Sequence, residues 1–375
     1  MKKENKKGGG TVLLPVMMLC AVAIGVVFGI RMVGMLDFSG DFPLTDLLRL
    51  FVSFLLGCYL AMLLHVLLHE TGHLVFGLLT GYRFTSFRLF CFMLVKDKQG
   101  VRLRIHRVAG TAGQCLMEPP RQAEKMPFVL YNLGGVLFNL FFSVLAAVGC
   151  FFLPAESLAH LLLTLFCVLG LYMAFMNGLP FGGGVVQNDG TNLLHACRSA
   201  SARRGLWLQL AVSARLSAGV RMRDMPSEWF ALPPAEDMQD GLSASIGVMA
   251  ANRLLDEYRK EETAALLRRL LAETRPLPLH RHMMTMDLIT LSLLLRDGED
   301  VQKLLTPELE KTMLAMKDNI TVLRTRYALA INSGDTVRAA ELLAQFEKKA
   351  PKHPYPAELF TEQELMKELS VMQTM

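Results

Sequence analysis

Residues 50–73 read LFVSFLLGCYLAMLLHVLLHETGH, and the stretch from Leu50 to Leu68 contains no Asp, Glu, Lys or Arg. At about 1.5 Å of rise per residue, a helix of this length crosses the hydrocarbon core of a bilayer, which is about 30 Å thick. The run ends in histidines and a glutamate. Ionisable residues at membrane depth are costly and usually functional, so these residues predict a membrane span with a site inside it.

The composition also indicates a membrane protein. Of the 375 residues, 52% are hydrophobic and only 19% are charged, which is more apolar than an ordinary soluble domain. The apolar residues are concentrated before about residue 195. We therefore expect a membrane domain over residues 1–197 and a soluble domain over residues 198–375. The net charge of +5 is modest and no basic run suggests nucleic acid, so we expect no nucleic-acid partner.

Charge-free runs predict four membrane spans. They cover residues 11–30, the run from Leu50, residues 127–155, and a run from Ser157 to Asn188. A cleaved signal peptide is the alternative for the first run, because Ala-Val-Ala at 21–23 resembles a cleavage site. Apolar residues continue beyond that tripeptide, which favours an uncleaved span.

The basic residues of the loops predict the orientation. The N-terminus, residues 82–126 and the chain after 197 are rich in Lys and Arg, whereas residues 36–46 and 154–157 have none and carry acidic residues instead. The positive-inside rule then predicts a multi-pass protein of the cell membrane with both termini in the cytoplasm. Counted from the outer end of its span, the first histidine of the HETGH sequence lies about 28 Å along the helix, towards the cytoplasmic leaflet.

Residues 82–107 predict a small cytoplasmic β-hairpin. An apolar strand over 87–95 precedes a polar turn at 96–100, and apolar residues then alternate with basic ones over 101–106. The hairpin can lie on lipid headgroups with its arginines facing anionic lipid, or its edge can pair with an extended substrate. The Gly- and Pro-containing residues that follow are interpreted as a loop without an assigned structure.

Beyond residue 198 the periodicity is helical. The pattern Ala-Ala-x-Leu occurs at 264–267 and again at 339–342, and the turn sequence at 297–300 resembles that at 333–336. Repeats of this length favour degenerate tetratricopeptide-type hairpins, which stack because one hairpin cannot bury its apolar face. A plain helical bundle is the alternative.

The sequence His69-Glu70-Thr71-Gly72-His73 carries the chemistry. Histidines at i and i+4 share one helix face and can bind one zinc ion. The glutamate between them can act as a general base on a water molecule beside the metal. His65 lies on the same face, but only the 69/73 pair encloses a glutamate, so we assign His65 a supporting or packing role. Polar groups that merely pack inside a helix bundle are the alternative.

Asp189 is the candidate third ligand, because catalytic zinc sites commonly use three protein ligands and one open position. It ends a long charge-free run and precedes Gly190. The alternative is an aspartate that caps a helix beginning near Thr191. The glycines at 182–184 let the backbone turn sharply, as a chain lining a cavity at membrane depth must, which favours the ligand.

Three pieces of sequence, in this order, resemble the site-2 protease (M50) family of intramembrane zinc metalloproteases. Residues 69–73 resemble its zinc-binding helix, and residues 135–139, GVLFN, resemble its GxxxN motif. Asn177-x-x-Pro180, followed by Asn-Asp-Gly at 188–190, resembles its NxxP…DG segment. The resemblance covers about residues 45–197. The chain departs from the family in the longer spacing between Pro180 and Asp189, and we find no PDZ-like insert.

The resemblance implies an all-α membrane protease that cuts a transmembrane segment of a membrane protein near the cytoplasmic face. It implies one zinc ion per chain, held by His69, His73 and Asp189. Glu70 would be the base. Asn139 and Asn177 would lie near the substrate or its oxyanion, or would instead form hydrogen bonds between helices. The family says nothing of the C-terminal helical domain, for which we expect a protein partner.

Two functions of other classes remain open from the sequence. A metal-binding transporter or sensor would distribute acidic residues and histidines over several spans, whereas here they cluster at one end of one helix and at Asp189. A non-catalytic membrane scaffold would recruit partners through the helical repeats.

Overall fold

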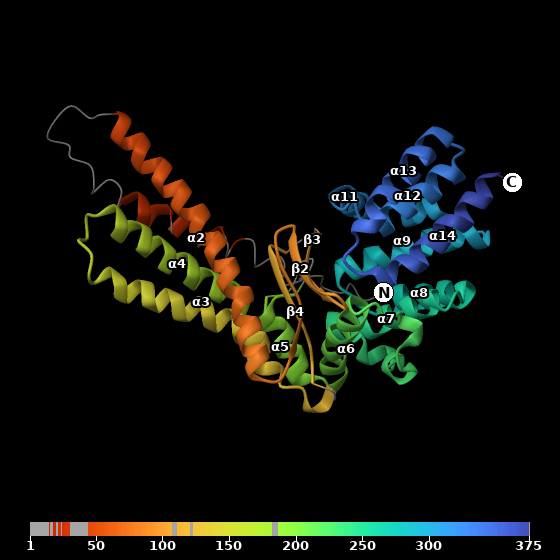
Figure 1. Ribbon diagram of the computed structural model, residues 1–375, viewed down its shortest axis with the longest axis horizontal. Coiled ribbons are helices and arrows are strands. Elements are labelled where there is room, and N and C mark those ends of the chain that lie inside the picture. Colours follow the sequence, from red (N-terminus) through yellow and green to blue (C-terminus); the bar gives the residue numbers. More distant parts are fainter. Residues whose placement is uncertain are drawn as a thin grey trace, which may run out of the picture. The chain divides into compact units, whose positions relative to one another are not determined.

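The computed structural model describes residues 15, 18–19, 22–23, 25–30, 44–106, 111–120, 123–181 and 187–374. This part of the chain is mostly helical, with one small antiparallel sheet (Figure 1). The chain divides into two compact units. The first unit comprises residues 1–80 and 127–194, and the second unit comprises residues 81–126 and 195–375. The sheet segment is thus grouped with the C-terminal helices.

Three helices of the first unit are long and apolar enough to cross a membrane. They are α2 (Leu44–Leu79), α3 (Phe128–Cys150) and α4 (Leu158–Gly178), which pack against one another. They correspond to three of the four predicted spans. The remaining prediction, over residues 11–30, lies mostly outside the described residues. Its described residues are helical, and the Phe28 ring lies 5.6 Å from that of Phe54 between centroids.

The first unit exposes large apolar side chains and buries several polar ones. Phe51, Val52 and Tyr59 of α2 each leave half or more of their surface exposed, whereas His65 and Asn139 are completely buried. A soluble bundle shows the opposite distribution, and large exposed apolar surfaces mark contact with lipid or another protein. Buried polar groups between helices of this kind are typical of membrane proteins.

The sheet has four strands in the order β3-β2-β1-β4, and every pairing is antiparallel. The strands are β1 (Arg83–Leu89), β2 (Phe92–Asp97), β3 (Gly100–Ile105) and β4 (Gly113–Glu118). The predicted polar turn is confirmed, because β2 and β3 form a hairpin across residues 98–99.

Two details of the predicted hairpin are wrong. The expected strand over 87–95 is broken at Phe90, whose φ of 54° turns the chain between β1 and β2. In addition, the residues interpreted as a loop include β4. In β4, Cys115 and Met117 are buried, but Leu116 between them is also apolar, so the sequence has no apolar–polar alternation that would have predicted the strand.

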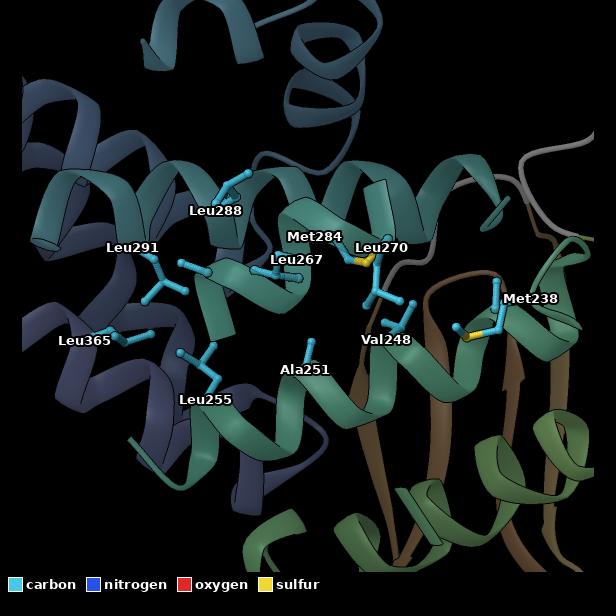
Figure 2. Packing of buried hydrophobic residues seen from close by; sticks show 12 residues of the cluster. Met238, Val248, Ala251, Leu255, Leu267, Leu270, Met284, Leu288, Leu291 and Leu365 are labelled. Atoms are coloured by element: carbon cyan, nitrogen blue, oxygen red, sulfur yellow. The ribbon is translucent and has the colours of Figure 1, made fainter. Parts of the chain in front are cut away.

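The second unit contains consecutive helices that pack pairwise. They are α6 (Ala200–Ser217), α7 (Gly241–Asp256), α8 (Lys260–Glu273), α9 (Pro278–Leu295), α10 (Val301–Leu304), α11 (Pro307–Ala315), α12 (Ile320–Asn332), α13 (Thr336–Lys349) and α14 (Pro356–Thr374). Figure 2 shows Val248, Ala251 and Leu255 along one face of α7, directed at Leu267 and Leu270 of α8. This i, i+3, i+7 spacing makes the apolar stripe that buries the helix.

The recurring sequence pattern occupies equivalent positions in two helices. Ala264 and Leu267 of α8 are buried, as are Ala339 and Leu342 of α13, and in both helices the second alanine is exposed. The glycines of the two recurring turns, Gly298 and Gly334, have φ of 82° and 73°. Glycine adopts this left-handed conformation without a steric penalty, and Gly334 follows the end of α12 directly. The end of α9 is formed by Arg296, which is itself left-handed with a φ of 51°.

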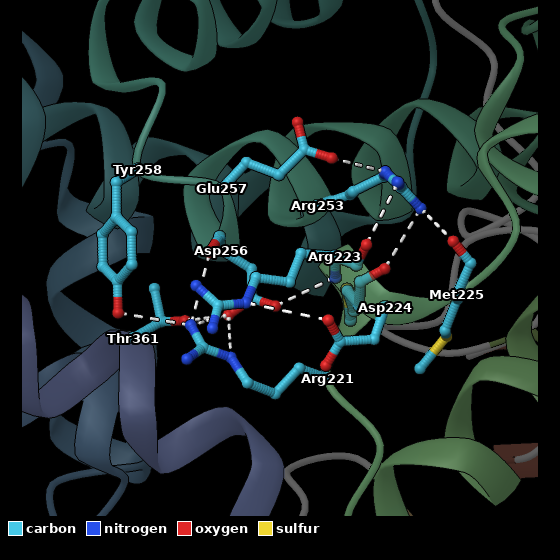
Figure 3. Close-up of polar contacts among 10 residues, drawn as sticks. Arg221, Arg223, Asp224, Met225, Arg253, Asp256, Glu257, Tyr258 and Thr361 are labelled. Carbon is cyan, nitrogen blue, oxygen red and sulfur yellow. Dashed lines mark hydrogen bonds and ion pairs between the residues drawn. The ribbon is translucent and has the colours of Figure 1, made fainter.

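A polar network joins the segment before α7 to α7 and α14. Asp256 at the end of α7 accepts hydrogen bonds from Arg221, from the backbone N–H of Arg223 and from Thr361 of α14 (Figure 3). The Arg221 guanidinium lies 2.6 Å from the carboxylate. These bonds satisfy a carboxylate that would otherwise be buried unpaired, at a cost of several kcal/mol.

Candidate metal centre

Two glycines allow the HETGH helix to lie against α3 at backbone distance. A Cβ at Gly72 of α2 would overlap the carbonyl group of Gly134 in α3, and a Cβ at Gly134 would overlap that of Gly72. Small residues permit such close crossings of membrane helices. The crossing brings His69 and His73, on either side of Gly72, directly onto α3.

A second close approach places α5 (Asp189–Arg198), where a Cβ at Gly190 would overlap the Gly178 carbonyl at the end of α4. Asn188 completes this junction, because its side-chain oxygen accepts the N–H of Thr191 at 2.9 Å. Asn188 is therefore the capping residue of this helix, and the Asp189 carboxylate is left to face α2. The capping role of Asn188 was not predicted, although an Asn immediately before the first helical residue is a capping signal.

The side chains of His69, His73 and Asp189 converge in the first unit. His69 Nε2 lies 3.0 Å and His73 Nε2 lies 3.4 Å from Asp189 Oδ2, and the two Nε2 atoms are 3.2 Å apart. Within the described ranges, this is the one group of three His, Cys, Asp or Glu residues whose ligand atoms lie this close together. All three predicted ligands are thus brought together from α2 and α5.

These three atoms have the spacing of zinc ligands. With Zn–N and Zn–O bonds of about 2.0–2.1 Å in a tetrahedral arrangement, ligand atoms lie about 3.3 Å from one another. The observed separations of 3.0, 3.2 and 3.4 Å match this spacing closely. Two imidazole nitrogens and one carboxylate oxygen also form a donor set that zinc prefers, with a fourth position left for water or substrate.

A backbone carbonyl sets the tautomer of His73. Its Nδ1 lies 2.7 Å from the carbonyl oxygen of Tyr131 in α3. A carbonyl oxygen only accepts, so Nδ1 must donate, and Nε2 of the neutral ring keeps its lone pair. Ligating histidines in metal sites are commonly held in this way.

Glu70 is buried beside the convergent ligands. Only 7% of its surface is exposed, and its charge interacts with the His73 ring. It projects from the same helical turn as the two histidines. Its position on the helix therefore suits a general base that acts on a water molecule at this site.

The other predicted residues lie in different environments. Asn139 of α3 is fully buried between the rings of His65 and His69. Asn177, in the last turn of α4, donates a hydrogen bond of 3.0 Å to the Met173 carbonyl of its own helix. The glycine run at 182–184, which we expected to turn the chain towards Asp189, lies outside the described residues.

Comparison of the chain with models of protein families, with curated protein sequences and with solved structures finds no match.

Proposed function

We propose that the protein is an intramembrane zinc metalloprotease of the site-2 protease type, with one zinc ion per chain held by His69, His73 and Asp189. The observation that carries the proposal is the convergence of these three ligand atoms, at 3.0–3.4 Å from one another, beside a buried glutamate. The helices around the site are long and apolar enough to cross a membrane. The order of the three resembling motifs adds to this support.

A zinc ion in this position would polarise the scissile carbonyl group and lower the pKa of a water molecule. Glu70 takes the proton from that water and passes it to the leaving amine. The apolar helices exclude other water, so the charges of the site act in a medium of low dielectric constant. Asn177 is our candidate for a polar contact with the substrate or its oxyanion.

The proposed substrate is a transmembrane segment of another membrane protein, cut near the cytoplasmic face. Such a segment hides its peptide bonds in helical hydrogen bonds, so it must unwind locally before Glu70 and its water can act. Helix-weakening residues such as glycine near the cut lower this cost by about 1 kcal/mol each. The site cleaves its substrate only after that opening.

The same proposal includes the topology and the accessory domain. We propose four spans in the cell membrane, both termini in the cytoplasm, a protease domain over residues 1–197 and a tetratricopeptide-like domain over residues 198–375. The equivalent burial of the two Ala-Ala-x-Leu patterns supports the repeat assignment. We propose that this domain binds a protein partner, and that the sheet contacts lipid headgroups or substrate.

Replacement of the base tests the reaction. Cells that carry Glu70→Gln should accumulate at least one uncleaved membrane protein whose fragment is present with the wild-type chain. Glu156→Gln is the matched control, because Glu156 is exposed in the connection between α3 and α4, and it should leave cleavage unchanged. Identical membrane proteomes for all three chains would contradict the protease and favour a scaffold or a transporter.

A further inference from the structure

The His69 ring lies in a cradle formed by α3. A Cβ at Gly135 would lie 2.5 Å from Nδ1 and from Cε1 of this ring, so the ring lies directly over the bare glycine backbone. One helical turn further along, Asn139 Nδ2 lies 3.3 Å from His69 Nδ1. Gly135 and Asn139 are the two defined positions of the GxxxN sequence. Both therefore contact the same metal-ligand ring.

The Asn139 amide also contacts a second histidine. Its Oδ1 lies 3.3 Å from His65 Nδ1, and the opposite ring nitrogen, His65 Nε2, lies 2.8 Å from the Phe166 carbonyl oxygen in α4. His65 and Asn139 are completely buried, and His69 is 6% exposed. The four groups form a continuous chain from α4 through α2 and α3 to the candidate metal ligand.

The direction of the hydrogen bonds along this chain follows from the chemistry of its groups. The Phe166 carbonyl only accepts, so His65 Nε2 donates, and Nδ1 of the neutral His65 ring is an acceptor. An acceptor requires the amide nitrogen of Asn139 opposite it. A half turn of the amide exchanges its nitrogen and oxygen without a change of shape. With the nitrogen towards His65, the amide oxygen faces His69 Nδ1 and accepts its N–H.

We propose that His65 and Asn139 are positioning residues that hold His69 as the Nδ1–H tautomer, with the Nε2 lone pair directed at zinc. The inference rests on the proposed zinc site. The opposite amide orientation donates to His69 Nδ1 and puts the ring proton on Nε2, where it binds Asp189 Oδ2, 3.0 Å away, instead of a metal. The orientation of the Asn139 amide thus decides whether His69 Nε2 has a lone pair for zinc or a proton for Asp189. Each ligand histidine then has an oxygen on Nδ1, as His73 has the Tyr131 carbonyl.

Zinc affinity of the purified full-length chain in detergent, measured by competition with a chromophoric chelator, tests this role. Asn139→Leu has a similar volume but no acceptor, and it should weaken binding by about 10–100-fold, as loss of a metal ligand's supporting partner typically does. Asn139→Asp, as the protonated acid, donates its O–H to His65 Nδ1 and keeps an acceptor for His69 Nδ1–H, so it should bind within about threefold of the wild type. Ser143→Ala is the control, because Ser143 donates to the Asn139 backbone carbonyl one turn further along and should change nothing.

A second variant tests the far end of the chain of hydrogen bonds. His65→Phe keeps a ring that stacks on Phe166, from which the His65 ring centroid is 4.1 Å distant, but removes both hydrogen bonds. It should weaken zinc binding by about 3–10-fold, less than Asn139→Leu, because the amide remains but is no longer oriented. If Asn139→Leu does not purify as a monodisperse protein, this variant decides the question, and wild-type affinity overturns the proposal.

The outcomes separate this inference from the proposed function. If the wild type binds zinc and Asn139→Leu binds it equally well, the positioning role is wrong and the protease proposal stands. If Asn139→Asp loses as much affinity as Asn139→Leu, the acceptor is not what matters and the role is again wrong. If the wild type itself binds no zinc, both proposals fall. Near wild-type zinc affinity in Asn139→Asp, together with weakened affinity in Asn139→Leu, supports the positioning role of Asn139.

Discussion

Each unit of the protein has a buried polar cluster, and the two clusters differ in where their positive charge comes from. In the second unit, Arg324 pairs with Asp287 and lies 2.9 Å from Glu362, which also accepts a hydrogen bond of 2.8 Å from Thr321. In the first unit, Asp189 pairs with two histidines and, within the described residues, with no lysine or arginine.

The difference distinguishes a cluster that supports the fold from one that suits a ligand. Arg324 is 1% exposed and supplies the cation of its cluster from within the chain. Burial nevertheless raises the pKa of both Asp287 and Glu362, since one guanidinium serves two buried carboxyl groups. The Asp189 cluster instead directs three ligand atoms at one point, which is the arrangement that a metal cation completes.

Removal of the internal cation should produce the largest effect. Arg324→Met leaves two buried carboxyl groups unpaired and should lower the free energy of unfolding of the second unit by about 3–5 kcal/mol. Both tryptophans, Trp207 and Trp229, lie in this unit, so urea unfolding followed by tryptophan fluorescence reports it directly. Exposed Lys303→Met is the control. Zinc content should not change in either variant, and a loss of zinc in Arg324→Met would contradict the independence of the two clusters.

Acid should destabilise the second unit through the half-buried His280. Burial lowers the pKa of His280 from 6.5 to about 4, so below pH 6.5 the unfolded chain takes up a proton that the folded chain resists. The stabilisation is complete above pH 6.5 and is lost as the pH falls towards 4, by up to about 3 kcal/mol. Asp287 and Glu362, with raised pKa values, act in the opposite direction. His280→Gln should therefore flatten the pH dependence of the free energy of unfolding of the second unit. An unchanged pH dependence would mean that other groups cause it.

Crowding of the His69 ring should weaken metal binding without a large change in stability. Gly135→Ala introduces a Cβ 2.5 Å from the ring, so the ring must move, and zinc affinity should fall by about 10–100-fold. Gly25→Ala is the matched control, because a Cβ there meets nothing within 4 Å. Equal affinities in the two variants would show that the ring is not held at this position.

Replacement of the whole internal cluster should have the smallest effect. The triple variant Arg324→Met, Asp287→Leu and Glu362→Leu removes all three charges together, and apolar substitutes for buried ion pairs are often neutral or stabilising. We expect a free energy of unfolding within about 1–2 kcal/mol of the wild type, measured by the same urea titration. If the triple variant loses as much free energy of unfolding as Arg324→Met alone, the charged cluster itself stabilises the fold, and its charges do more than neutralise one another.

Local patterns in the sequence were sufficient to predict the elements marked by a long apolar run or by a polar turn. The apolar runs predicted α2, α3 and α4, and the polar residues at 96–100 predicted the β2–β3 turn, because each signal lies within a few consecutive residues. The break at Phe90 was not predictable in this way, since a positive φ at a phenylalanine is rare. The grouping of the sheet with the C-terminal helices depends on tertiary contacts that no local pattern encodes.

In the candidate site, too, local patterns predict part of the arrangement and tertiary contacts determine the rest. The i, i+4 histidines share a face by helical geometry alone, but Asp189 reaches them because α5 packs closely against the end of α4 at Gly190 and Gly178. The connection from His65 through Asn139 to His69 joins three helices, and only the folded chain shows it. The Arg324 cluster was missed for the same reason, because its members come from α9, α12 and α14.

The three-ligand zinc site is best tested by the zinc content per chain of the detergent-purified full-length protein, for the wild type, His73→Ala and Asp189→Ala. We expect about one zinc ion in the wild type and a sharp loss in both variants, because each removes one of three ligands. Loss in His73→Ala but not in Asp189→Ala would contradict the three-ligand site. No stoichiometric zinc in correctly folded wild type would contradict the metalloprotease as a whole.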